Sequence, residues 1–315
     1  MIDLPWKPDP DYHRLLNALR RRGDPSRIVF LELFADPEIM GAILEEPPSP
    51  TKKIKDRETL NRWIDQKIQF WYRLGYDVIW HGPNLTWSGL LPIEAGDSAA
   101  LSRGKRTWVN EKAGSVTSWE EFERYPWPSF ADVDFYPLEY AIHHLPEGMA
   151  IIAQISGILE PAMWLMGYES FALAIYDQPD LIEAIFSRLA EIYVPLAHAM
   201  VEMDRVMALW MGDDMDYKTS TMISPKHLCK YVFPIQKQIA VIAHGKGLPF
   251  LLHSCGKLDT ISAEERLIEL GHKRKYGLSV PDRFLQHGND RQDGGYSNAF
   301  VNRGCLPKRY CSRLS

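Results

Sequence analysis

The chain has 315 residues, of which 45% are hydrophobic, a size that suits one large α/β barrel or two ordinary domains. Its formal net charge is −5, and the basic residues are mostly interleaved with acidic ones, which argues against a nucleic-acid partner. Because the chain does not open with a secretory leader pattern, and no apolar run approaches about 18 residues, we expect a cytoplasmic protein without a membrane partner.

The first part of the chain predicts one β/α unit. A basic helix is expected over residues 11–22, and a strand over residues 28–34. Asp36 is then placed to cap a helix that has proline at its first position and extends to Leu44.

A second unit follows a proline-rich break at residues 47–50. Residues 59–74 place most of their apolar side chains on one helical face, and residues 76–80 predict a short strand. The next segment, residues 81–128, is a long excursion rich in glycine, proline and tryptophan. Excursions of this length inside a compact domain are usually functional.

The central part of the chain predicts three more strands, separated by helices. The strand at residues 149–155 is nearly all apolar, as expected where helices cover both faces of a sheet. Further strands are expected at 206–211 and 249–254, and helices at 160–176, 179–203 and 226–244, the last begun by Ser224 and Pro225 and kinked at Pro234. Strands alternating with such helices predict a parallel sheet or barrel, with the functional residues at the carboxyl ends of the strands.

Two potential metal ligands, His253 and Cys255, stand at the end of the last expected strand. Residues i and i+2 of an extended chain share a face, so one cation could bind both side chains. Imidazole nitrogen with cysteine thiolate favours zinc, and a third ligand and a substrate thiol would complete an open site. The alternative is a buried cysteine beside a hydrogen-bonded histidine.

Four other residues lie near the expected strand ends and are weaker candidates. Asp213 and Asp214, as candidate catalytic residues, end the strand at 206–211, where a carboxylate could orient a ligand or a metal-bound histidine. Both could equally be a helix-capping or turn pair. Tyr217, a candidate catalytic residue, and Gln154, a candidate for cofactor binding, qualify by position alone.

Four segments carry a resemblance to a known family. They are Glu32-Leu33-Phe34-Ala35-Asp36-Pro37-Glu38, the stretch from Ser118-Trp119-Glu120-Glu121-Phe122 to Trp127-Pro128, Gly212-Asp213-Asp214 with Ile223-Ser224-Pro225, and His253-Ser254-Cys255-Gly256. In this order, over about residues 25–262, they resemble the uroporphyrinogen decarboxylase superfamily, and more closely its corrinoid-dependent methyltransferase branch than the decarboxylases proper.

The resemblance implies a TIM-type (β/α)8 barrel and a zinc-bound thiolate that receives a methyl group from a methylated corrinoid protein. His253 and Cys255 would hold the zinc, and the partners would be a corrinoid protein and a small thiol. The family's third ligand is a cysteine much nearer the C-terminus, where this chain offers Cys305 and Cys311. Neither lies in a sequence like the family's strand, so the role is carried over to neither.

Decarboxylation is the alternative activity. The decarboxylases of the family begin their first strand with an arginine-rich segment that binds a substrate with many carboxylates. This chain has Glu32-Leu33-Phe34 at that place, and Arg27 lies at the wrong end of the expected strand. An acidic residue there would repel such a substrate.

The composition changes at about Gly271. Residues 271–315 contain nine Lys or Arg against three Asp, a net charge of +6, and have no amphipathic period. Five expected strands precede them, and a stretch this short cannot supply three more β/α units of ~30 residues each. We therefore predict an incomplete barrel of about five β/α units over residues 1–270 and an aberrant, frameshifted or disordered tail over 271–315. A truncated and inactive polypeptide is thus a third functional alternative.

Overall fold

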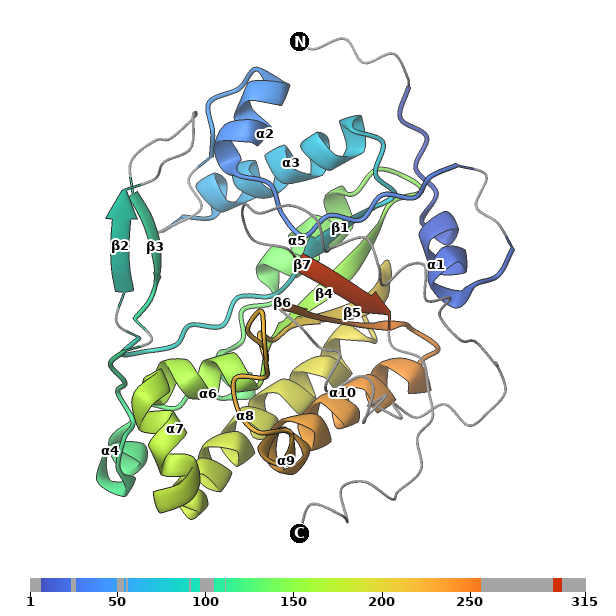
Figure 1. Cartoon of the computed structure of the whole chain (residues 1–315). Helices are drawn as coiled ribbons and strands as arrows, with labels where there is room; N and C mark the ends of the chain where they lie inside the picture. Colours follow the sequence, from blue (N-terminus) through green and yellow to red (C-terminus); the bar gives the residue numbers. More distant parts are fainter. Residues whose placement is uncertain are drawn as a thin grey trace. The chain divides into compact units, whose positions relative to one another are not determined.

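The computed structural model describes residues 7–23, 27–49, 54, 56–90, 92–96, 105–110, 112–255 and 297–301. Its architecture is α/β, with a five-stranded sheet in the order β1-β4-β5-β6-β7 and a separate pair formed by β2 and β3 (Figure 1). The strands of the main sheet are β1 (Val78–His81), β4 (Ala150–Ser156), β5 (Val206–Gly212), β6 (Phe250–Cys255) and β7 (Ser297–Val301).

The chain divides into two compact units. The first unit draws on residues 1–110, 127–154 and 199–209, and the second unit on residues 111–126, 155–198 and 210–315. Strands β4 and β5 are each divided between them, so the first residues of each strand belong to the first unit and its carboxyl end belongs to the second.

The first unit is built around β1 and β4. These strands pair in parallel, from Val78 opposite Ala150 to His81 opposite Ala153, and the backbone N–H of Ile151 donates to the carbonyl of Arg205 just before β5. Its helices are α1 (Tyr12–Arg20), α2 (Pro37–Leu44), α3 (Arg57–Arg73) and α5 (Tyr136–His144), with a short 3-10 turn, η1 (Phe130–Asp132). The amphipathic helix α3 packs against α2, α5 and β1, as its apolar face predicts.

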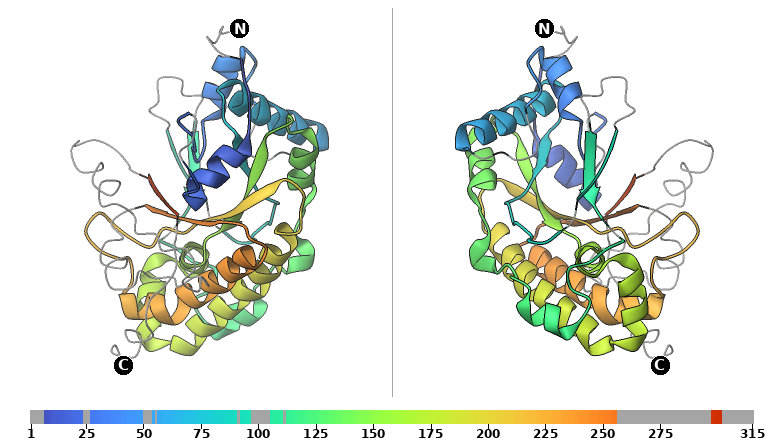
Figure 2. Two further views of the ribbon diagram at one scale, coloured as in Figure 1. Left: turned by 90° about the vertical axis from the view of Figure 1, so that its right-hand side faces the viewer. Right: turned by 90° about the vertical axis from the view of Figure 1, so that its left-hand side faces the viewer.

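The second unit contains the ends of β4 and β5, strands β6 and β7, and a set of helices. Its helices are α4 (Trp119–Arg124), α6 (Leu159–Met166), α7 (Tyr168–Asp177), α8 (Pro179–Met200), α9 (Pro225–His227) and α10 (Phe233–Gly245), with the π turn η2 (Leu228–Val232) between the last two. Figures 1 and 2 show α6, α8 and α10 gathered on one side of β6. The apolar residues of α6, α7, α8 and α10 and those of β6 form one core, in which Phe171, Phe186 and Phe250 are buried.

Four of the five predicted strands of the barrel domain are confirmed, with bounds that differ by one or two residues. They are β1, β4, β5 and β6. In the last three, nearly every residue is buried, which is the pattern of strands covered on both faces.

The prediction of a strand over residues 28–34 is wrong. That segment is described, yet it belongs to neither sheet and runs directly into α2. Ile28, Phe30 and Phe34 alternate along it and are 76%, 48% and 70% exposed. A strand needs a partner for its backbone groups and a face to bury. Among the described strands none pairs with this segment, so the apolar alternation alone does not make it a strand.

Two predicted helices are interrupted. The helix expected over residues 160–176 is divided at Gly167, whose φ of +74° ends α6 before α7 begins. The helix expected after Ser224 begins as predicted, because Ser224 Oγ accepts the N–H of His227. It then widens into η2, which ends two residues before Pro234. Proline lacks an N–H and crowds the preceding turn, which accounts for a π turn close to the position where the sequence predicts a kink.

The excursion predicted over residues 81–128 contains regular structure. In the first unit, β2 (Pro92–Gly96) pairs antiparallel with β3 (Lys105–Val109). In the second unit, α4 (Trp119–Arg124) begins with a side-chain cap, because Ser118 Oγ accepts the N–H of Glu121, and the Glu121 carboxylate in turn accepts the N–H of Thr117, the residue before the cap. Helix capping therefore accounts for part of the Ser-Trp-Glu-Glu-Phe segment.

The main sheet is open in the part of the chain that the structure describes. Its edge strands there are β1 and β7, and β7 pairs antiparallel with β6, from Leu251 opposite Val301 to Cys255 opposite Ser297. An open sheet agrees with the predicted incomplete barrel. The predicted boundary at residue 270 and most of the predicted tail lie outside the described residues. No helix among the described residues combines the length and apolarity needed to cross a membrane.

Candidate metal centre

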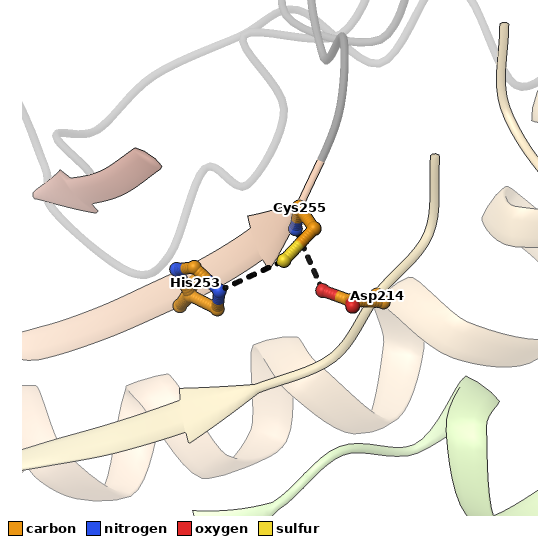
Figure 3. A group of neighbouring side chains, drawn as sticks. All are labelled: Asp214, His253 and Cys255. Atoms are coloured by element: carbon orange, nitrogen blue, oxygen red, sulfur yellow. Dashed lines mark hydrogen bonds between the residues drawn. The ribbon is translucent and has the colours of Figure 1, made fainter. Parts of the chain in front are cut away.

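Three side chains of the second unit converge at the carboxyl ends of β5 and β6. His253 and Cys255 lie on the same face of β6, with Cys255 Sγ 3.5 Å from His253 Nε2 (Figure 3). Asp214 follows β5, and its Oδ1 accepts the backbone N–H of Cys255 at 2.6 Å. One nitrogen, one sulfur and one oxygen atom of these residues all lie within 4.8 Å of one another. Together the three residues form the candidate metal centre.

His253 is held by a stacked aromatic ring. The side chain is buried, and its ring lies 5.8 Å from that of Trp210 with an angle of 23° between the planes. Gly212 makes room for this indole, because a Cβ at that position would lie 2.6 Å from the Trp210 ring. The imidazole therefore has little freedom to turn away from Cys255.

The thiol of Cys255 lies among acidic groups. Burial raises the pKa of the Cys255 thiol to about 12, and the carboxylates of Asp214 and Glu160 add to that shift. A bound cation has the opposite effect on the thiol pKa, since it binds the thiolate and displaces the proton to solvent. The cluster thus combines negative charge with soft and borderline ligand atoms, a combination that suits a divalent transition metal.

Asp213 points away from the candidate metal centre and caps α6. Its fully buried carboxylate accepts the backbone N–H groups of Ile158, Leu159 and Glu160 and the side-chain amide of Gln236, at 2.8 to 3.2 Å. Burial raises the pKa of Asp213, and these hydrogen bonds oppose the shift. Asp213 therefore takes the capping alternative, whereas Asp214 joins the candidate ligands.

Ser254, between the two candidate ligands, faces the opposite side of β6. Its hydroxyl accepts the backbone N–H of Met215 at 2.9 Å and lies 3.4 Å from Asp216 Oδ2. Ser254 and Asp216 are both buried, and burial raises the pKa of Asp216 to about 7. Sequence reasoning did not single out Ser254, Asp216 or Gln236, although the alternation of β6 was a signal that Ser254 points away from its neighbours.

The remaining sequence candidates lie elsewhere. Tyr217 is 44% exposed, and its ring packs edge-on against Tyr168 with the centroids 6.3 Å apart. Gln154 lies in the part of β4 that belongs to the first unit, two residues before the strand ends, where its carbonyl oxygen would be 2.7 Å from a Cβ on Gly82. Its predicted contact with a cofactor stays a prediction. Cys305 and Cys311 lie outside the described residues.

The geometry of the candidate metal centre fits zinc. Zinc binds histidine nitrogen at about 2.0–2.1 Å and thiolate sulfur at about 2.3 Å in a tetrahedron, so ligand atoms lie roughly 3.3–3.8 Å apart. The separation of 3.5 Å between His253 Nε2 and Cys255 Sγ is within that range. Since every ligand pair lies within 4.8 Å, the Asp214 carboxylate would need to move by no more than about 1.5 Å.

The comparisons with known proteins point to one family. The family model described as Uroporphyrinogen decarboxylase (URO-D) matches residues 115–271, a segment that contains the whole candidate metal centre. A solved structure of a methyltransferase from Methanosarcina mazei is similar over 79% of this chain and 70% of its own, with a TM-score of 0.52 and 15% identity. That similarity is one of fold. No curated protein sequence matches the chain.

Proposed function

Because the chain belongs to the uroporphyrinogen decarboxylase superfamily and resembles a methyltransferase in fold, we propose that it transfers a methyl group from a methylated corrinoid protein to a small thiol at a zinc site. The observation that carries the proposal is the convergence of Asp214, His253 and Cys255 on one point. Three protein ligands leave a tetrahedral ion one open position, which is the arrangement of catalytic rather than structural zinc sites.

The proposed ligands come from two neighbouring segments. His253 Nε2 and Cys255 Sγ would bind from β6, and the carboxylate of Asp214 from the loop after β5. When bound, zinc supplies Lewis acidity, which lowers the pKa of a thiol substrate at the open position. The protein contributes a fixed, buried imidazole, two half-buried ligands and a site at the carboxyl ends of the strands.

The proposed reaction transfers a methyl group from the cobalt of the corrinoid to the sulfur of the thiol. The sulfur of the thiolate attacks the methyl carbon, a sulfur–carbon bond forms as the cobalt–carbon bond breaks, and the cobalt retains the electron pair of the broken bond. The thiol proton is released to solvent. Because the site would hold the thiolate close to the methyl donor, the reaction would proceed like an intramolecular one. This positioning lowers the activation free energy of the methyl transfer.

The ion pairs of Arg14 and Arg27 in the first unit disfavour decarboxylation as the activity. Arg27 donates to Asp77 Oδ1 at 2.9 Å, and Arg14 donates to the same carboxylate. Asp77 is 2% exposed and directly precedes β1, so both guanidinium groups are committed to a buried carboxylate at the amino end of that strand. They are therefore poorly placed to bind a polycarboxylate substrate at the carboxyl ends of the strands.

We propose further that residues 271–315 are an aberrant tail, and that the barrel is therefore incomplete. The family match ends at residue 271, where the composition changes. The nucleotide sequence downstream of the codon for Leu270 tests this proposal. An alternative reading frame that continues a strand–helix pattern supports a frameshift, and a gene in which no frame does so contradicts it.

Metal content tests the enzymatic proposal against an inactive fragment. The purified full chain should contain close to one zinc ion, and His253→Ala and Cys255→Ala variants should lose it. Cys229→Ala is the matched control, since Cys229 is a half-buried cysteine on η2, outside the candidate metal centre, and should leave the zinc content unchanged. Methylcobalamin with a small thiol should then be demethylated by the wild type and not by the two ligand variants. A wild-type chain that binds no zinc supports the inactive fragment.

A further inference from the structure

We infer that Ser254 is a positioning residue of the candidate metal centre, which holds the loop after β5 so that Asp214 reaches His253 and Cys255. The inference rests on the proposed function, because it concerns how the metal ligands are arranged. Ser254 has no contact with the cluster through its own side chain, since alternate residues of a strand point to opposite faces. Its effect must therefore pass through the loop.

The loop is fastened to β6 by three successive hydrogen bonds. The backbone N–H of Asp213 donates to the carbonyl of His253 at 2.9 Å. The backbone N–H of Cys255 donates to Asp214 Oδ1 at 2.6 Å. The backbone N–H of Met215 donates to the hydroxyl of Ser254 at 2.9 Å. Asp214 thus lies between two anchored neighbours, and only the third bond depends on a side chain of β6.

The hydroxyl of Ser254 is suited to this task in both of its hydrogen-bonding roles. Its oxygen accepts from Met215, and its proton can be donated to Asp216 Oδ2, 3.4 Å away. Because Ser254 is completely buried, water has no access to replace either bond. An alanine at this position would leave the N–H of Met215 without its acceptor, and the loop would be free to shift away from β6.

A cobalt titration of the full chain tests the inference. Co²⁺ reports zinc-type sites, because its visible bands depend on coordination geometry and a charge-transfer band reports thiolate binding. Ser254→Ala should weaken Co²⁺ binding roughly 10- to 100-fold, as is typical for residues that orient metal ligands, and should reduce the bands of the four-coordinate ion. Urea unfolding of the metal-free protein, measured in parallel, reports any general loss of stability.

Two matched variants separate positioning from destabilisation. Ser224→Ala removes a different serine of the second unit, one that caps α9, and should lower stability without changing Co²⁺ affinity. In an Asp214→Ala background, Ser254→Ala should change the affinity by less than about twofold, because the ligand it positions is already absent.

The inference is overturned if Ser254→Ala binds Co²⁺ as tightly as the wild type. It is also overturned if Ser254→Ala lowers the Co²⁺ affinity by the same factor in the Asp214→Ala background as in the wild type. If the wild type binds the metal through His253 and Cys255 but is indifferent to Ser254, the inference alone fails. If the wild type binds neither Co²⁺ nor Zn²⁺, the proposed function fails, and the inference fails with it.

Discussion

At the scale of single residues, two adjacent aspartates have opposite surroundings. Asp213 is fully buried and accepts four N–H groups, whereas Asp214 is half-buried and turns toward a thiol and an imidazole. Both carry the same chemical group and follow the same strand. Their neighbours in space therefore determine that one carboxylate is structural and the other is available to a cation.

Replacing Asp213 by asparagine should destabilise the protein by roughly 3 kcal/mol, because an amide offers one acceptor where two oxygens are in use and places a donor against donors. Urea unfolding measures the loss. Asp56→Asn is the control, since Asp56 caps α3 at the surface and asparagine caps helices equally well. Equal unfolding midpoints for the two variants would contradict the role assigned to Asp213.

Lys67 places a buried amino group in the first unit. The side chain is 5% exposed, donates to the carbonyl of Trp80 and lies 3.4 Å from His81 Nδ1. Burial lowers the pKa of Lys67 from 10.5 to about 7. Between these two values the unfolded chain binds a proton that the folded chain lacks, so the free energy of unfolding increases as the pH rises through that window.

We expect this lysine to give the protein a measurable pH dependence. From about pH 7.5 to about pH 9.5 the wild type should gain roughly 2 kcal/mol of stability relative to a Lys67→Met variant. Urea unfolding of both proteins at the two pH values gives the difference directly. Parallel pH profiles for the wild type and Lys67→Met would show that Lys67 keeps an ordinary pKa in the folded state.

At the scale of elements, the close approach of α6 to the end of β5 depends on a glycine. A Cβ on Gly157 would lie 2.4 Å from Asp213 Oδ1 and 2.6 Å from the carbonyl oxygen of Gly212. These distances are too short for any side chain. The carboxylate can thus cap α6 only because residue 157, two positions before the helix, has no side chain.

Gly157→Ala should therefore cost roughly 2 kcal/mol of stability, as overpacking of a tight interior does. Gly245→Ala is the matched control, because Gly245 ends α10 and a Cβ there would meet nothing within 4 Å. That variant should be neutral or slightly stabilising, since alanine favours the helical backbone. Thermal or urea unfolding distinguishes the two, and a neutral Gly157→Ala would mean that α6 adjusts freely.

Most elements follow from local patterns, and the failures have identifiable causes. Strands β4, β5 and β6 were predictable because each is a short apolar run bounded by turn residues. The segment over residues 28–34 is also a short, mostly apolar stretch, but no strand among the described residues pairs with it. Pairing partners are distant in sequence, so no local pattern reports whether one is present.

At the scale of the whole molecule, metal binding should be linked to folding. The proposed ligands come from two segments about forty residues apart, so an unfolded chain lacks the assembled site. Free zinc at 100 times its dissociation constant should stabilise the wild type by about 2.7 kcal/mol. His253→Ala and Cys255→Ala should lose this gain, and Cys229→Ala should retain it.

Unfolding curves with excess zinc and with a chelator measure this linkage. A zinc-dependent shift that survives in both ligand variants would place the metal elsewhere in the chain. The measurement is independent of methyl transfer, so it applies whether or not the polypeptide is catalytically competent.

The amino-acid sequence by itself determined the α/β class, the strand that carries His253 and Cys255, and the shared face of these two residues, because alternation and apolar runs are local properties of the chain. Only the tertiary structure decided that Asp214 joins them while Asp213 caps α6. That outcome depends on the path of the loop after β5, which is held by hydrogen bonds to residues 39 to 55 positions away. The free energy of such contacts is gained only when distant segments meet, so it leaves no periodic signal in the sequence.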